Sequence, residues 1–452
     1  MRASTRVWAR RNRSMSESAR SGTTSRTLWG IIAVGFGVMF LSSSIKGAYQ
    51  VYFRDLSELF DLGRAQFALS GALFGLCLGL VSPLVGTICD RYGPSRSMIS
   101  GALVAALAFL LLGLFQNFPL FLVAYGVMAA YALAAMTFVP MGVWIDNLFG
   151  ERHKGLAYAA VSNGVAIGFM VLSPLWVWLN GWLDWSTLAL MIAMGFVVGV
   201  AVPLYWADRY FPVGIETHSE SQSRQAPGVS GVLRELRQPL FILLAISFAG
   251  CGSSMAFIDL HYAPLVQEAG LPDSQDAASA LALSLSVLGG FELLGALAVG
   301  HLAGKVQPAM LLALLYGVRS MILAWLAISP GSGTFVVFGA FFGATYMGTV
   351  VLTSMMCLRL YGASVKGRMF GLLFTVHQLA VFGTAWLGGL ARDLTGDYTL
   401  TTLGVAAFCG LSVIAALALQ VVTPRSNSRS RVPSSAGSGE TAMPSGQGQS
   451  QV

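Results

Sequence analysis

Six ionisable side chains lie inside long apolar runs of the sequence, where they could bind or carry charge. A charged group held away from water is costly, so such groups usually pair, face a cavity or take part in proton transfer. Each is therefore a candidate functional residue, with a structural ion pair or hydrogen bond as the simpler alternative. In chain order they are Lys46, Asp259, His261, Glu292, Arg319 and His377.

Their expected depths suggest partners. At 1.5 Å per helical residue, Glu292 and Arg319 lie about 17 and 16 Å from the same side in neighbouring runs, so they could form an ion pair; alternatively, Glu292 faces a cavity and couples transport to protons. Lys46 could hold an anionic substrate, exchange protons, or extend its amine to water. Asp259 and His261 lie near the level of Lys46 and could form an outer gate of opposing charges, or a hydrated interfacial pair.

Other polar residues are expected close to these groups. His377 lies near the middle of its run, where it could donate to a carboxylate, carry a proton, or bond to a neighbouring helix. Five uncharged polar side chains together predict a polar cavity with an aromatic element, although each alone is typical of helix–helix contacts. They are Tyr131, Asn163, Tyr346, Thr349 and Gln378.

The sequence lacks the patterns of several other chemistries. Its five cysteines lie in or beside apolar runs without metal-ligand spacing, which favours buried hydrophobic side chains. There is no His-Glu-x-x-His motif, no phosphate-binding Gly-x-x-x-x-Gly-Lys-Ser/Thr loop, and no recognisable nucleophile arrangement. We therefore expect no enzymatic activity, no metal and no cofactor.

The composition indicates which elements position these residues. Hydrophobic residues make up 55% of the chain and charged residues 10%, against about 25% charged residues in soluble domains. An apolar run of about 20 residues can cross a bilayer as a helix. The chain therefore predicts an all-α membrane protein with twelve transmembrane helices, at about 29–52, 66–88, 97–115, 119–146, 155–179, 186–206, 238–262, 278–302, 308–328, 334–358, 368–390 and 398–422.

One long polar connection separates these runs six and six. We expect disordered cytoplasmic tails at 1–28 and 423–452, six-helix bundles at 29–206 and 238–422, and a cytoplasmic linker at 207–237. The first tail is rich in arginine and has no apolar leader before a cleavage site, so no signal peptide is expected, and Met15 is an alternative start.

The distribution of basic residues predicts the orientation. With the N-terminus inside, 22 of the 27 Lys and Arg residues fall in cytoplasmic segments, and three, Arg54, Arg64 and Arg392, in the opposite loops. Because basic residues accumulate on the cytoplasmic side, both termini are expected in the cytoplasm and the protein in the cell inner (plasma) membrane. The same placement argues against a nucleic-acid-binding face, despite the formal charge of +7.

The two bundles show signs of duplication. Gly86–Arg96, between the second and third runs, has a weaker copy at 300–305, about 214 residues later, and 152–157 is echoed by 365–371, 212 residues on. Similar offsets at matching places predict two halves related by an axis along the membrane normal, with the substrate site between them.

The first of these loops resembles the cytoplasmic Gly-x-x-x-Asp-Arg-x-Gly-x-x-Arg loop of the major facilitator superfamily, a family of membrane transporters. The resemblance covers about 29–422 and implies two six-helix bundles. Gly86 would allow close helix approach and Gly93 a tight turn, while the charged residues would hold the cytoplasmic side closed. The implied gating residues are Gly86, Asp90, Arg91, Gly93 and Arg96.

Three further regions, 149–168, 251–261 and 343–396, resemble the monocarboxylate-porter branch and its bacterial relatives. Animal members of this branch use a lysine in the first span and an Asp–Arg pair in the eighth to bind the anion. Lys46 matches that lysine and Glu292 the acidic residue, but Ala296 occupies the arginine position. The resemblance thus implies a carboxylate site that is incomplete in this chain.

These observations favour a secondary active transporter that moves a small, monocarboxylate-like organic anion with H⁺ by alternating access, functioning in the lipid bilayer as a monomer. One alternative is an exporter of hydrophobic or cationic compounds, with Glu292 and Asp259 attracting the cation. Another is a membrane sensor that binds a solute without transporting it.

Overall fold

The computed structural model describes residues 25–149, 151–210, 236–271 and 274–422. In these ranges the chain is helical, with no strand, and twelve helices are long and apolar enough to cross a membrane. The predicted fold class is thereby confirmed. The two expected tails and most of the expected linker lie outside the described residues.

The N-half, as we name residues 25–210, contains the first six spans. Three of these spans, the first, fourth and sixth, are divided into consecutive helical segments. The elements are α2 (Ser25–Ser42), α3 (Ser44–Leu59), α4 (Arg64–Tyr92), α5 (Pro94–Leu114), α6 (Phe118–Phe121), η1 (Leu122–Ala129), α7 (Ala130–Met136), α8 (Phe138–Leu148), α9 (Glu151–Asn180), α10 (Trp185–Phe196), η2 (Val197–Ala201) and α11 (Val202–Tyr210).

The C-half, residues 239–422, contains the other six spans. Its elements are α13 (Pro239–Ala256), η4 (Phe257–Tyr262), α14 (Ala263–Glu268), α15 (Ser274–Leu302), α16 (Pro308–Ile328), α17 (Ser332–Thr345), α18 (Gly348–Tyr361), α19 (Ala363–Thr395) and α20 (Thr399–Val422). The first and seventh spans extend to Leu59 and Glu268, beyond the apolar runs at 29–52 and 238–262, because both helices continue into polar turns.

Local sequence explains where the helices begin and end. Pro94 and Pro308 occupy the first turns of α5 and α16, where a missing backbone N–H costs nothing. Asn117 caps the short α6 by accepting from the Leu120 amide at 3.1 Å. Gly93, between α4 and α5, has φ = 92°, and Gly396 ends α19 with φ = 86°. Both conformations favour glycine, so the tight turn expected at Gly93 is present.

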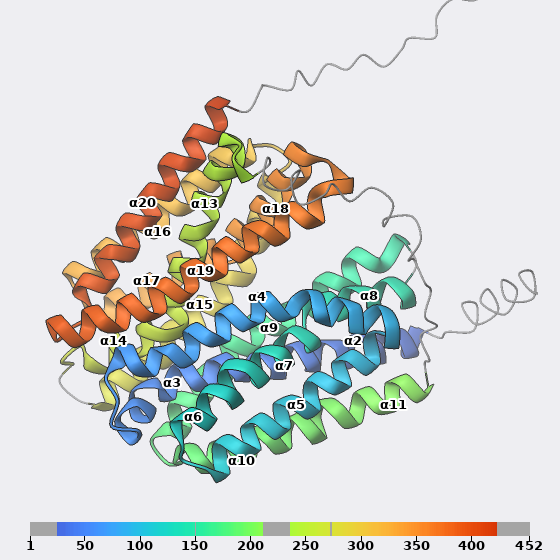
Figure 1. Ribbon diagram of the computed structural model, residues 1–452, viewed down its shortest axis with the longest axis horizontal. Coiled ribbons are helices and arrows are strands. Elements are labelled where there is room, and N and C mark those ends of the chain that lie inside the picture. Colours follow the sequence, from blue (N-terminus) through green and yellow to red (C-terminus); the bar gives the residue numbers. More distant parts are fainter. Residues whose placement is uncertain (1–24, 150, 211–235, 272–273, 423–452) are drawn as a thin grey trace, which may run out of the picture.

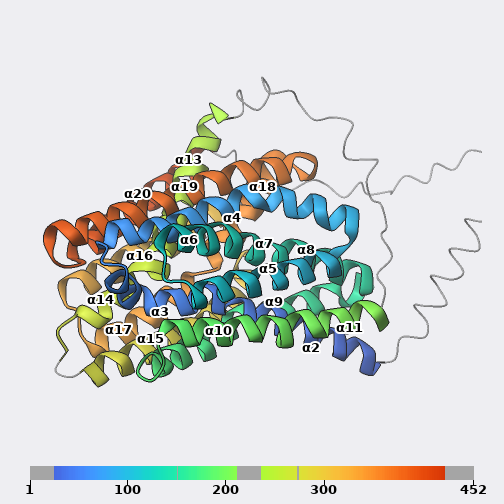
Figure 2. The same cartoon turned by 60° about the horizontal axis from the view of Figure 1, so that its bottom comes forward.

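The two halves meet at one end of the molecule and diverge toward the other (Figure 1). We call the end with the α3–α4 and α19–α20 connections the closed end. The opposite end, where α2 and α13 begin and α11 and α20 finish, is called the open end. Figure 2 shows the same long axis from another side, with the start of α2 and the end of α11 lying together.

Close packing between the halves involves small residues. Helix α4 lies against α19, and a Cβ on Gly389 would be 2.7 Å from the Ala65 Cα. Farther along α4, a Cβ on Gly79 would be 3.0 Å from the Gln378 Cγ, whereas a Cβ on Gly86 would meet nothing within 4 Å. The helices therefore separate between Gly79 and Gly86. The close approach expected at Gly86 is wrong for this conformation, because this part of α4 lies where the halves diverge.

Candidate functional site

An ion pair joins the two halves. The Lys46 Nζ on α3 lies 2.5 Å from the Asp259 Oδ2 on η4, and the two side chains are 27% and 15% exposed. One turn farther along α3, the Gln50 Nε2 donates to the Ile258 carbonyl at 2.6 Å. The structure thus brings together the lysine and aspartate that the sequence placed at a common level.

These two residues are 213 positions apart, which equals the spacing of the sequence repeat to within a residue. Equivalent residues on either side of a two-fold axis can touch only where the axis passes between them. We call Lys46 and Asp259 the axial pair, because they connect the two halves and are separated by nearly the spacing of the predicted repeat.

Irregular helix geometry occurs at corresponding places in the two halves. The first span is interrupted at Ser43, and the seventh contains the π-helical turn η4 that carries Asp259. The fourth span is interrupted at Thr137, and the tenth between Thr345 and Gly348. Interruptions of this kind free backbone groups and are frequent at binding sites within membrane proteins.

Glu292 and Arg319 do not form the ion pair considered from the sequence. Among the described residues the Glu292 carboxylate, 4% exposed, has no hydrogen bond or ion pair, although it lies within electrostatic reach of Lys46, Asp259 and Arg319. Equal depth did not bring the two side chains together, because Arg319 directs its donors toward other helices.

Arg319 is fully buried and stabilises the interruption of the tenth span. Its Nη2 donates to the carbonyls of Thr345 and Tyr346 at 2.7 and 2.8 Å, and its Nη1 donates to the Ser254 hydroxyl at 2.7 Å. The Thr345 hydroxyl accepts from Nε at 3.0 Å, and the Phe342 ring lies 5.0 Å from the guanidinium carbon. Arg319 thus supplies donors to carbonyls that the broken helix leaves without an amide partner.

His377 is packed inside the C-half. It is 5% exposed, lies between the rings of Phe248 and Phe374, and its Nδ1 is 3.3 Å from the Gln378 Oε1. Its Nε2 is buried and has no hydrogen-bond partner within the described part of the chain. Gln378 lies at the interface between the halves, against Gly79.

Of the remaining polar candidates, some lie near the ion pair and Arg319, and others make contacts between helices of one half. Tyr346, at the interruption of the tenth span, is 9% exposed. Thr349 is fully buried and bonded to Arg319 and the Cys251 thiol, at 3.2 and 3.1 Å. Tyr131 bonds to the Ser100 hydroxyl at 2.8 Å within the N-half. Asn163 on α9 is half-buried.

His261 is not a partner of Asp259, although the two lie on the same π-helical turn. It is fully buried, with its Nε2 3.2 Å from the Thr384 carbonyl and its ring edge-on to Phe53 of the other half. It therefore packs between the halves on the closed side, where the sequence argument expected a gate.

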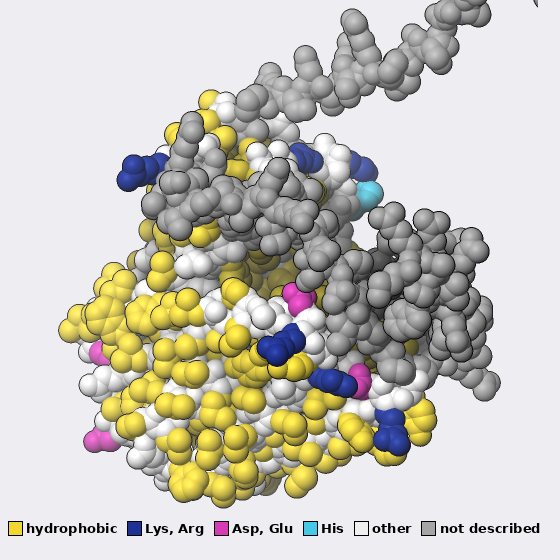
Figure 3. Space-filling view, turned by 45° about the vertical axis from the view of Figure 1, so that its right-hand side comes forward, with side chains coloured by type: hydrophobic (Ala, Val, Ile, Leu, Met, Phe, Trp, Pro, Cys, Tyr) yellow, Lys and Arg dark blue, Asp and Glu magenta, His cyan; other side chains and the backbone are white. Residues whose placement is uncertain are grey.

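The motif loop lies at the open end. The side chains of Asp90, Arg91 and Arg96 are exposed, and within the part of the chain that is described none of the three forms an ion pair. Figure 3, which brings this end forward, shows basic side chains around a surface hollowed between the halves. The inner gate assigned to this loop is thus not engaged in this conformation.

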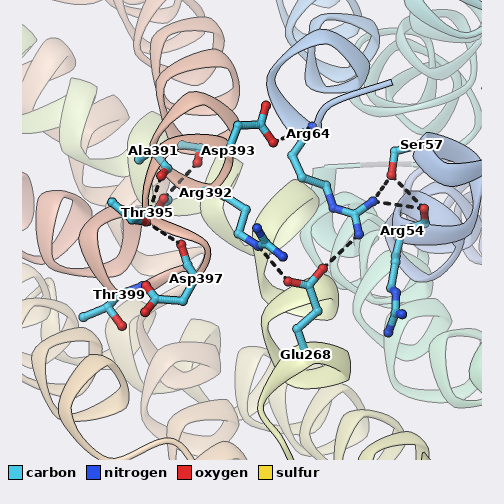
Figure 4. Close-up of polar contacts among 12 residues, drawn as sticks. Arg54, Ser57, Arg64, Glu268, Ala391, Arg392, Asp393, Thr395, Asp397 and Thr399 are labelled. Carbon is cyan, nitrogen blue, oxygen red and sulfur yellow. Dashed lines mark hydrogen bonds and ion pairs between the residues drawn. The ribbon is translucent and has the colours of Figure 1, made fainter. Parts of the chain in front are cut away.

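Sequence reasoning missed a polar network at the closed end (Figure 4). The Glu268 carboxylate lies between Arg64 of the N-half and Arg392 of the C-half, with nitrogen–oxygen distances of 2.9 and 2.8 Å. The available signal was the pair of arginines on a side otherwise poor in basic residues. Across the described residues, no cluster of three or more His, Cys, Asp and Glu side chains could hold a metal ion.

Comparisons with known proteins agree with this architecture. The family model described as "Major Facilitator Superfamily" matches residues 28–385. An uncharacterised MFS-type transporter of Bacillus subtilis is 25% identical over 87% of this chain and 95% of its own length. Monocarboxylate transporter 12 of Xenopus laevis is 22% identical over 83% and 85% of the two chains.

Solved structures show the same fold. A bacterial homologue of the human lysosomal transporter Spinster, in an inward-facing and unoccupied conformation, superimposes with a TM-score of 0.67 at 13% identity and covers 88% of this chain and 98% of its own. The family match and the twelve spans lead to one conclusion. The chain belongs to the major facilitator superfamily, and it is a multi-pass membrane transporter rather than an enzyme.

Proposed function

We propose that this transporter moves a small organic anion together with protons, and that Lys46 is the cation that receives the anion. The axial ion pair supports the proposal most directly. Lys46 lies at the contact between the two halves, and its present partner, Asp259, is itself a carboxylate. A substrate carboxylate can replace Asp259 on the same amine, which would release the two halves from each other.

The balance of charge near the axis supports coupling to protons. Lys46, Asp259, Glu292 and Arg319 sum to zero when all are ionised. A proton on Glu292 leaves a net charge of +1, and a bound monoanion returns the site to neutrality. Because net charge inside a membrane is costly, the proton and the anion favour each other's binding.

Further parts of the proposal concern the gates and the orientation. We assign the axial pair and His261 to the outer gate, and the loop of Asp90 and Arg91 to the inner gate. Exposed basic residues at the open end favour a cytoplasmic location for it, which makes this conformation inward-facing. Tyr346 and Gln378 would line the substrate cavity near the axis.

Uptake into proteoliposomes tests the function. A panel of labelled monocarboxylates would be offered with and without an imposed pH gradient, to the unaltered transporter and to Glu292→Gln. We expect gradient-driven uptake that the variant loses, while Asp276→Asn, an exposed carboxylate on the same helix, retains it. Carboxylate uptake that ignores the gradient would refute the proton coupling.

A specific observation favours the second candidate, an exporter of cationic compounds. Lys46 is neutralised by Asp259, whereas Glu292 has no partner within the described ranges, so an unpaired carboxylate could attract a cation. The variant Lys46→Ala separates the two functions, because it should weaken anion transport and leave cation export intact. Binding of the panel without any transport would instead indicate a solute sensor.

A further inference from the structure

The closed end is held by a carboxylate between two guanidinium groups from opposite halves. Glu268 ends α14, and its Oε1 accepts from the Arg64 Nη2 at the start of α4, while its Oε2 accepts from the Arg392 Nε near the end of α19 (Figure 4). The three side chains are 17%, 11% and 24% exposed. At this degree of burial, charge-assisted hydrogen bonds are stronger than surface ion pairs.

If the two halves separated, each charged side chain of this group would still have a partner of opposite charge in its own half. The Arg64 Nη2 also lies 3.3 Å from the Glu58 Oε1, within the N-half, where the Glu58 side chain is 55% exposed. Arg392 and Glu268 both belong to the C-half and can stay paired. Opening the closed end therefore removes one arm of the bridge, and Arg64 loses Glu268 but keeps Glu58 as a partner. The retained partner avoids the cost of an isolated charge.

A second contact between the halves lies beside this bridge. The Asp393 carboxylate of α19 accepts from the backbone amides of Arg64 and Ala65 at 2.9 and 2.8 Å. These are the first amides of α4, whose own N-cap residue, Gly63, offers no side chain. The C-half thus provides the cap of an N-half helix, and a carboxylate at this place is also favoured by the helix dipole. A Cβ on Gly63 would lie 2.8 Å from the Asp393 Oδ2, so glycine leaves room for the approach.

We propose that Arg64, Glu268, Arg392 and Asp393, which we call the Glu268 lock, set how much of the time the closed end stays shut. Among the described residues, none of the four makes an ion pair or hydrogen bond with Lys46, Asp259 or Glu292. The lock therefore acts on the conformational equilibrium and not on the bound substrate. It depends only on alternating access between the two halves.

Distances between spin labels across the closed end measure this equilibrium without any substrate. In a background with the five native cysteines replaced, labels are attached at Gln116→Cys and Ser329→Cys, exposed positions in short connections of the two halves. The purified full chain in nanodiscs is expected to show mainly the short distance. Glu268→Gln keeps an oxygen acceptor and removes the charge, so the ratio of long to short distances should rise about tenfold.

Two further variants make the test specific. Glu58→Gln removes a carboxylate that also contacts Arg64, but this carboxylate belongs to the same half as Arg64 and is largely exposed to water. The variant should therefore not raise the ratio of long to short distances. Gly63→Ala leaves every charge in place and only displaces Asp393. It should raise the ratio of long to short distances about fivefold. It also serves if Glu268→Gln fails to fold. A distance distribution that neither Glu268→Gln nor Gly63→Ala changes would overturn the proposal, as would an equal effect of Glu58→Gln.

Discussion

The axial pair can be tested by exchanging its two side chains. If Lys46 and Asp259 stand at equivalent places on either side of a two-fold axis, the double variant Lys46→Asp with Asp259→Lys places the same two charges opposite each other again. Each single replacement instead sets two like charges together, two carboxylates in one case and two ammonium groups in the other. The exchange therefore tests the position of the axis as well as the strength of the pair.

The size of the effect follows from the burial of the pair. Exposed ion pairs contribute about 0–1 kcal/mol, and breaking a buried one costs about 3–5 kcal/mol. With side chains 27% and 15% exposed, the loss in the closed conformation should be about 2 kcal/mol, between those limits. That corresponds to a change of about 30-fold in the ratio of open to closed molecules at the closed end.

The label pair at Gln116→Cys and Ser329→Cys reports this ratio directly. Each single replacement should raise the ratio of long to short distances about 30-fold. The double exchange should return this ratio to within about threefold of its value in the unaltered protein, as expected for two strongly coupled residues in a double-mutant cycle. If the double exchange is no more closed than the worse single variant, the two residues do not face each other across an axis, and their assignment as equivalent residues of the two halves fails.

Two predictions concern the stability of helix contacts within the C-half. Arg319→Lys should lower the free energy of unfolding by about 3 kcal/mol, measured as a fall in Tm. An ammonium cannot reproduce the planar donors that reach Ser254 and the carbonyls of Thr345 and Tyr346. An unchanged Tm would show that Arg319 does not stabilise the interruption of the tenth span. Gly252→Ala should destabilise the protein and Gly317→Ala should not, because a Cβ at the first position would collide with the His377 carbonyl and at the second would meet nothing within 4 Å; equal Tm values for both variants would contradict this.

The parts of the molecule that the sequence predicted are those with a strong local signal. Twelve apolar runs predicted twelve spans, and a lysine and an aspartate at one level in different halves predicted opposing charges. Their distance of 2.5 Å agrees with that expectation, while their role as a gate stays a prediction. In each case the local environment, a charge in an apolar run, is rare enough to identify the residue.

The partners that could not be predicted depend on rotation and on helix breaks. Depth along a helix suggested a bond between Glu292 and Arg319, but which way a side chain faces changes by about 100° per residue. The carbonyls that bind Arg319 are free only because the tenth span is interrupted between Thr345 and Gly348, and Gly348, one of many glycines in the spans, did not by itself identify the break. Glu268 and Arg64 are 204 positions apart, so their contact depends on how the halves close.

The two halves differ in a way that bears on the mechanism. If the predicted repeat has the spacing of the axial pair, 213 residues, the N-half positions equivalent to Glu292 and Arg319 are Gly79 and Ala106. Gly79 permits close contact with Gln378 of the opposite half, whereas Glu292 introduces an ionisable group at the corresponding place. Under the predicted duplication, the N-half has a small residue for packing where the C-half has an ionisable one. Under the proposed proton coupling, a proton on Glu292 would act on the C-half and would reach the N-half through the axial pair. A variant that carries Gly79→Glu should therefore obstruct the contact with α19 without adding a second coupled proton.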